Sequence, residues 1–115
     1  MLFRSVPIMD NLQAIHLFRI AQEALSNALK HGHAKVVVIA LEASDGTCSL
    51  RVSDNGDGFH PLPGERKGMG LSIMRYRART ISGKLEIQPN SPMGTVVVCT
   101  IDKNASKTTA ALSES

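Results

Sequence analysis

Four short motifs follow one another along this chain, and their order limits its fold more than any other feature. They are QEALSNALKH (22–31), DNGDGF (54–59), GMGLSIMRYRA (68–78) and MGT (93–95). The first places a carboxylate and a carboxamide on a helix, the second an acid beside glycines after a strand, and the third glycines at the start of another helix. Each motif alone is weak, but their order and spacing indicate a nucleoside-triphosphate site.

The composition excludes some other classes of protein. The length of 115 residues and the 43% of hydrophobic residues are typical of one globular domain with a single core. Aromatic residues make up 3% without any Trp, and the net charge is +3, so neither a base-stacking surface nor a DNA-binding face is expected. Cys48 and Cys99 lie in apolar, strand-like segments and are expected to be buried free thiols in a reducing compartment.

The first ten residues are too short for a signal peptide or a membrane span. Pro7 and Asp10 also interrupt them. We therefore expect a soluble domain without direct membrane contact. Residues 1–11 are expected to form an N-terminal flank, residues 12–102 the domain, and residues 103–115, which are rich in Ser, Thr, Ala and Lys, a flexible tail.

The spacing of apolar residues predicts helices and strands in a simple order. In sequence, the predicted elements are a helix over 12–30 that ends at Gly32, strands over 35–43 and 47–53 with a turn over 44–46, a loop over 55–67, a helix over 69–81 that ends at Gly83, and strands over 84–88 and 95–101. This order favours an α/β fold, a two-layer sandwich in which a mixed β-sheet packs on helices that cover one of its faces.

Glu23 and Asn27 are four residues apart and therefore project from one face of the first predicted helix. Most pairs at this spacing face the solvent. Here apolar residues extend far around the helix, so we expect the pair to border a cleft. An Asn carbonyl is a hard oxygen ligand suited to Mg²⁺, and a carboxylate one turn away can polarise a nucleophile or a metal-bound water.

The two glycine motifs have different expected roles. Asp54 directly follows a strand, and Gly56 and Gly58 allow the chain to turn and to approach a ligand closely. An Asp at a strand end can accept a hydrogen bond from the exocyclic amine of adenine, although a bare DNG string is more often a plain turn. In the third motif, the free N–H groups at a helix start favour an anion; its residues are Gly68, Met69, Gly70 and Leu71.

Two further features have open interpretations. Arg66 and Lys67 precede the third motif and either neutralise phosphates or are solvated loop charges. Thr95 follows Gly94 and, taken alone, is best explained as a β-former in a strand.

Together, the four motifs resemble the catalytic ATP-binding domain of bacterial sensor histidine kinases, in the GHKL ATPase group. Within the kinases the chain is similar to the nitrate-sensor (NarX/NarQ-like) class. RIAQEALSNALKHGHA corresponds to the N box of that class, DNGDGF to its first glycine box, GMGLSIMRYRA to its second, and GKLEIQ with GTVVVCTI to its final hairpin. The resemblance covers residues 15–101 and implies the Bergerat (GHKL) fold, a mixed sheet backed by helices.

The resemblance also implies roles for single residues, with ATP and Mg²⁺ as ligands. Asn27 would bind Mg²⁺, and Glu23 would be the catalytic acidic residue near the γ-phosphate. Asp54 would hold the adenine amino group, and residues 60–67 would form a mobile lid. The remaining ATP-binding residues would be Lys30, His31 and Lys67 near the phosphates, Gly56 and Gly58 at the pocket floor, Gly68, Met69, Gly70 and Leu71 in the phosphate loop, and Thr95 beside the adenine.

One departure from the family pattern concerns the phosphate acceptor, which in these kinases is a histidine in a separate dimerising helical domain. His16, His31, His33 and His60 all lie in or beside the ATP-binding unit. We therefore expect an excised, cytoplasmic domain of a homodimeric parent kinase, either membrane-anchored or not, which acts with a downstream response regulator. Such a domain should bind ATP but scarcely autophosphorylate alone. The alternatives are a standalone protein-serine kinase of the anti-sigma type and a non-catalytic nucleotide-binding module.

Overall fold

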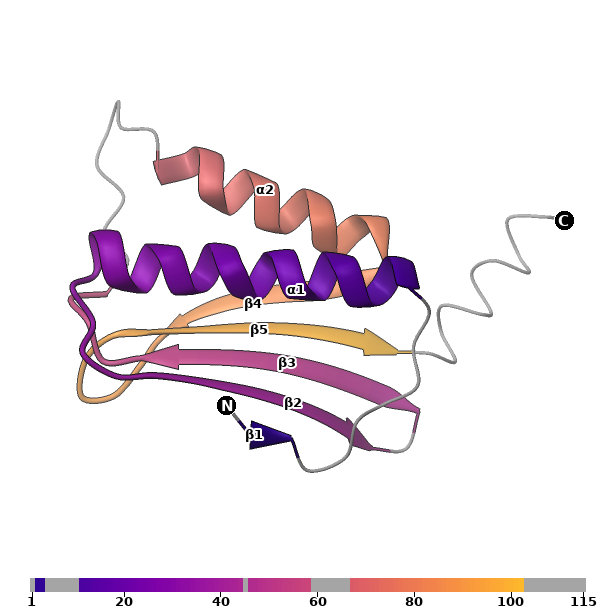
Figure 1. The fold of residues 1–115 in the computed structure, drawn as a ribbon, viewed down its shortest axis with the longest axis horizontal. Helices are drawn as coiled ribbons and strands as arrows, with labels where there is room; N and C mark the ends of the chain where they lie inside the picture. The colour runs from indigo at the N-terminus through magenta and orange to yellow at the C-terminus, as the bar shows by residue number, and fades with distance from the viewer. Residues whose placement is uncertain (1, 4–10, 45, 59–66, 103–115) are drawn as a thin grey trace, which may run out of the picture.

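The computed structural model describes residues 2–3, 11–44, 46–58 and 67–102, and it contains one five-stranded sheet with helices on a single face (Figure 1). The strand order is β1-β2-β3-β5-β4; β1 runs parallel to β2, and the other neighbours are antiparallel. The predicted two-layer sandwich with a mixed sheet is therefore confirmed. The elements are β1 (Leu2–Phe3), α1 (Asn11–Ser26), the π-helix η1 (Asn27–His31), β2 (Val37–Ser44), β3 (Thr47–Asp54), α2 (Lys67–Thr80), β4 (Gly83–Pro89) and β5 (Thr95–Asp102).

The alternation of side chains along β3 explains both the core and the position of Asp54. Cys48, Leu50 and Val52 are buried, whereas Arg51 between them is exposed. Because successive side chains of a strand point to opposite faces, the buried ones lie on the face that α1 and α2 cover. Asp54 continues the same alternation and is 8% exposed. The strand therefore ends by placing a carboxylate on the helix side of the sheet.

The two helices pack on this face and on each other. Leu17, Ile20 and Ala24 of α1 are buried at helical spacing, and Met74 and Ala78 of α2 belong to the same core. The complete buried cluster is Leu17, Ile20, Ala24, Cys48, Leu50, Val52, Met74, Ala78, Ile81, Val97, Cys99 and Ile101. Burying such side chains supplies the main free energy that holds helices on a sheet.

A polar contact also joins the two helices. Nη1 of Arg77 in α2 lies 3.2 Å from Nδ1 of His16 in α1. His16 therefore occupies a contact between helices, in keeping with its expected place as an ordinary residue of the first helix.

The end of the first helix differs from the prediction. The periodicity predicted a regular helix over 12–30, but the α-helix stops at Ser26 and continues as η1. Gly32 N donates to Asn27 O at 2.9 Å, a bond that spans five residues and widens the turn. The helix ends at Gly32 as predicted, yet Gly32 is right-handed with φ −93°, and His33 takes the left-handed conformation with φ 54°.

Other differences are small. No strand was predicted over residues 2–3, where β1 adds to the edge of the sheet. α2 begins two residues before its predicted start. The predicted tail over 103–115 and residues 60–66 of the predicted lid lie outside the described residues. Among the described helices, none combines the length and the apolar composition that crossing a membrane requires.

The two cysteines are buried free thiols, as predicted. Cys99 is fully buried and Cys48 is 1% exposed, on neighbouring strands of the sheet. Burial, and to a smaller extent the nearby Cys48, raises the pKa of Cys99 from 9.0 to about 11. Both side chains therefore act as small core residues.

Candidate functional site

The carboxylate of Asp54 joins two of the four sequence motifs. Its Oδ1 accepts a hydrogen bond from Gly56 N at 2.8 Å and a longer one from Thr95 N at 3.3 Å. No residue in the described part of the chain donates a hydrogen bond to Oδ2. One oxygen of this buried acid is thus held by backbone amides of both motifs, and the other accepts no hydrogen bond from the described residues.

The loop that follows Asp54 is bound to the segment that follows the first helix. Asp57 N donates to Gly32 O at 2.6 Å, and a Cβ at Gly56 would overlap the same Gly32 oxygen. Oδ1 of Asn55 accepts from both Lys35 N and Val36 N at 2.9 Å. The second motif therefore contacts the segment that follows the first motif, and a residue with a Cβ would not fit at position 56.

The turn between β4 and β5 closes on Asp54 from the other side. Gly94 has φ +109°, and a Cβ there would overlap the carbonyl oxygen of Asp54. Nδ2 of Asn90 donates to that same oxygen at 2.8 Å. We call the group of Asp54, Gly56, Asn90, Gly94 and Thr95 the Asp54 side of the site. Its members come from two segments, the end of β3 with the loop after it and the β4–β5 turn with the start of β5, and the other four all contact Asp54.

The second part of the site lies where the first turn of α2 approaches α1 and η1. A Cβ at Gly70 would lie 2.6 Å from Oε2 of Glu23 and 3.6 Å from Oδ1 of Asn27. Both side chains are half-buried, and neither forms a hydrogen bond with another described residue. We call Glu23, Asn27 and Gly70 the Glu23 side. The third motif therefore lies against the first in the fold.

The other predicted site residues fall into three groups. Lys30 and His31 are exposed in the last turn of η1. Leu71 is half-buried and packs against the core. Residues 67–69 form the first turn of α2, but the side chains of Lys67 and Met69 are outside the described set, as is residue 66.

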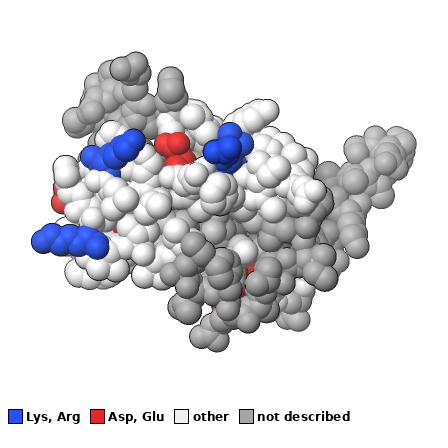
Figure 2. Space-filling view, viewed as in Figure 1, with Lys and Arg blue, Asp and Glu red and all other residues white. Residues whose placement is uncertain are grey.

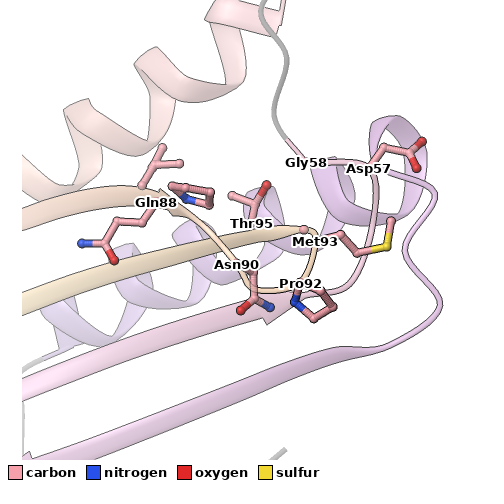
Figure 3. A pocket seen from close by; sticks show the side chains of 10 residues that line it. Asp57, Gly58, Gln88, Asn90, Pro92, Met93 and Thr95 are labelled. Atoms are coloured by element: carbon pink, nitrogen blue, oxygen red, sulfur yellow. The ribbon is translucent and has the colours of Figure 1, made fainter.

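A pocket of about 500 Å³ opens at the end of the sheet beside the Asp54 side (Figure 3). It includes Gly58 and Thr95 from the predicted set and is open to solvent, and Asp54 itself is not among the residues that line it. Figure 3 shows the Asn90 side chain directed toward the end of β3. The lining residues are Asp57, Gly58, Ile87, Gln88, Pro89, Asn90, Pro92, Met93, Gly94 and Thr95.

In the view of Figure 2, the Lys and Arg side chains of the described residues stand apart from one another and form no continuous basic surface there. Within the described ranges, no cluster of three or more His, Cys, Asp or Glu side chains is arranged to hold a metal ion.

Neither Asn55 nor Asn90 was predicted to be a site residue, although both hold the loop around Asp54 in place. Asn55 lies inside the DNG motif, in which only the neighbouring acid and glycines were predicted to have a role. Asn90 begins an Asn-Ser-Pro turn between two strands, which predicts a turn and nothing about a partner 36 residues away.

Residues 12–105 match the family described as histidine kinase-, DNA gyrase B-, and HSP90-like ATPase. The nitrate/nitrite sensor protein NarX of Escherichia coli (strain K12) is 43% identical over 88 residues, which are 76% of this chain and 15% of NarX. The sensor histidine kinase LiaS of Bacillus subtilis (strain 168) is 39% identical over 82 residues, which are 71% of this chain and 23% of LiaS. The chain thus spans less than a quarter of either relative.

A solved structure shows the same fold. The histidine kinase domain of the blue-light activated histidine kinase EL346 from Erythrobacter litoralis superposes with a TM-score of 0.75 at 23% identity, over 92% of this chain and 55% of that one. The family match covers most of the domain, and the structure joins the second motif to the fourth and brings the third against the first. The chain belongs to the histidine kinase-, DNA gyrase B-, and HSP90-like ATPase family, and its relatives within it are sensor histidine kinases.

Proposed function

We propose that this chain is the ATP-binding catalytic domain of a sensor histidine kinase and presents the γ-phosphate of ATP to a histidine on a separate dimerisation domain. The observation that carries the proposal is the position of Asp54, whose Oδ1 is held by the Gly56 and Thr95 amides beside an open pocket. The domain would act in the cytoplasm within a homodimeric parent, and a response regulator would receive the phosphoryl group.

The Asp54 side would recognise the base. Oδ1 is already bonded to two backbone amides, so Oδ2 is the atom that accepts a hydrogen bond from the exocyclic amine of adenine. Gly56 and Gly58 would form the floor of the base pocket, and Thr95 would border the adenine. A carboxylate can only accept hydrogen bonds, so the site would discriminate against guanine, which presents a carbonyl oxygen at the equivalent position.

The Glu23 side has oxygen atoms of the kind that a magnesium ion requires as ligands. Glu23 and Asn27 offer a carboxylate and an amide oxygen, both half-buried and without hydrogen bonds to other described residues. Mg²⁺ prefers such oxygens and takes only one or two of them from the protein. We assign the metal to Asn27, where Mg²⁺ would neutralise phosphate charge. Glu23 would orient and polarise the attacking histidine.

The start of α2 would bind the phosphates. The first N–H groups of a helix have no partner within the helix, and the helix dipole favours an anion there. Residues 68–71 lie in the first turns of α2, and Gly70 brings this backbone against Glu23. Lys30, His31 and Lys67 would add positive charge. Phosphoryl transfer depends mainly on such positioning and charge neutralisation.

Labelling with γ-³²P-ATP tests this proposal. The isolated 115-residue chain should take up almost no label, because the acceptor histidine lies on another domain. Adding the helical dimerisation domain of the parent kinase should give acid-labile labelling. Glu23→Ala and Asn27→Ala should suppress that labelling, while Gln22→Ala, an exposed neighbour on the same helix, should leave it intact.

Two outcomes would contradict the proposal. Strong labelling of the isolated chain at one of its own histidines would mean that the acceptor is inside this domain. Acid-stable labelling of a serine in a partner protein would assign the chain to a different class of kinase.

A further inference from the structure

The side chain of Asn90 forms two hydrogen bonds in different directions. Its Oδ1 accepts from Ser91 N at 2.9 Å, which shapes the turn to which both residues belong. Its Nδ2 donates to the carbonyl oxygen of Asp54 at 2.8 Å, 36 residues away in the sequence. The backbone N–H of Asn90 also donates to Gly94 O at 3.0 Å and closes the turn. The bond to Asp54 is therefore additional to those that the turn itself requires.

The same turn contacts Asp54 at two further points. Thr95 N donates to Oδ1 of Asp54 at 3.3 Å, and Gly94 approaches the Asp54 carbonyl so closely that a side chain would not fit. Asn90 is half-buried, so water competes only partly for this bond. The Asn90 side chain holds the backbone of Asp54 while the Thr95 amide holds its carboxylate, and together they set the direction of Oδ2.

We infer that Asn90 is a positioning residue that sets the orientation of the Asp54 carboxylate and thereby the preference of the site for an exocyclic amine on the purine. The inference rests on the proposed function, because it concerns the same nucleotide site. Asn90 is not required to touch the nucleotide. Its effect passes through the Asp54 carbonyl, which it binds directly.

The test compares the dissociation constants of ATP and purine riboside 5′-triphosphate, which lacks the exocyclic amine, by calorimetry on the 115-residue chain. Asn90→Asp keeps the acceptor for Ser91 N and removes the donor to Asp54. It should reduce the preference for ATP by roughly two- to tenfold, the range that the loss of one neutral hydrogen bond corresponds to. Asn11→Asp makes the same amide-to-carboxylate change at an exposed position at the start of α1, outside the pocket lining, and it should retain the wild-type preference.

A second variant separates positioning from folding. Asn90→Ala removes the donor without adding a negative charge, and it should reduce the ATP preference in the same way while circular dichroism shows a folded chain. A wild-type preference in both folded variants would overturn the inference, and so would the failure of both to fold, because Asn90 would then be a structural residue. A wild-type chain that binds neither nucleotide would instead refute the proposed function.

Discussion

The two sides of the site are built in different ways. On the Asp54 side, two segments distant in sequence are joined by backbone and side-chain hydrogen bonds around one buried carboxylate. On the Glu23 side, the side chains of Glu23 and Asn27 project from one helical segment toward Gly70 and form no hydrogen bonds with other described residues. The first side is ordered before a ligand arrives, whereas the second offers oxygen atoms that a ligand can engage.

This difference separates the consequences of mutation. A change on the Asp54 side disturbs contacts that also hold the sheet, the loop after β3 and the β4–β5 turn together, so it should affect stability and ligand preference. A change on the Glu23 side removes atoms that the fold does not use, so it should affect ligand binding alone. Four substitutions test this contrast.

Gly94→Ala should have the largest effect. A Cβ at this position overlaps the carbonyl of Asp54, which is backbone and cannot rotate away, and φ is +109°. Strain and overlap together should lower the free energy of unfolding by about 3 kcal/mol, which corresponds to a fall in Tm of roughly 10 °C or more. Thermal unfolding followed by circular dichroism measures this change.

Gly70→Ala is the matched control, because its Cβ would meet only the end of the flexible Glu23 side chain, at 2.6 Å from Oε2. Alanine also favours a helix by about 1 kcal/mol over glycine. The Tm should therefore stay constant or rise, while nucleotide affinity falls. Equal losses of stability at positions 70 and 94 would break the contrast between the two sides.

Asp54→Asn should have an intermediate effect, seen mainly in binding. The amide keeps an acceptor for Gly56 N and Thr95 N but can present a donor to the purine, which suits guanine better than adenine. Affinity for ATP should fall by roughly ten- to a hundredfold, and discrimination against GTP should weaken. Calorimetry that gives the wild type and the variant the same ATP affinity would remove Asp54 from the adenine role.

Asn27→Ala should have the smallest effect on stability. Its side chain forms no hydrogen bond with another residue of the described ranges, and alanine is at least as good a helix former, so the Tm should change by no more than about 3 °C. The dependence of ATP binding on Mg²⁺ should be lost. A fall of many degrees in the absence of nucleotide would show that Asn27 is structural and that the metal has another ligand.

Much of the fold could be predicted because the relevant signals are local. Helical spacing predicted α1, and alternation along 47–53 predicted β3. The π-turn at Asn27–His31 was not predictable from this periodicity. Each hydrogen bond of a π-helix spans one residue more than that of an α-helix, and the two helices share most of their apolar pattern. β1 was missed because two residues carry no periodicity.

The candidate site likewise has features that the sequence could predict and features that it could not. The sequence by itself determined which residue types were available: a carboxylate and an amide one helical turn apart, an acid at a strand end, and glycines where the chain turns. Only the tertiary structure decided that Asn90, Gly94 and Thr95 close on Asp54 and that Gly70 approaches Glu23. The physical reason is that these contacts join segments brought together by sheet register and helix packing, and a local pattern contains no information about such partners.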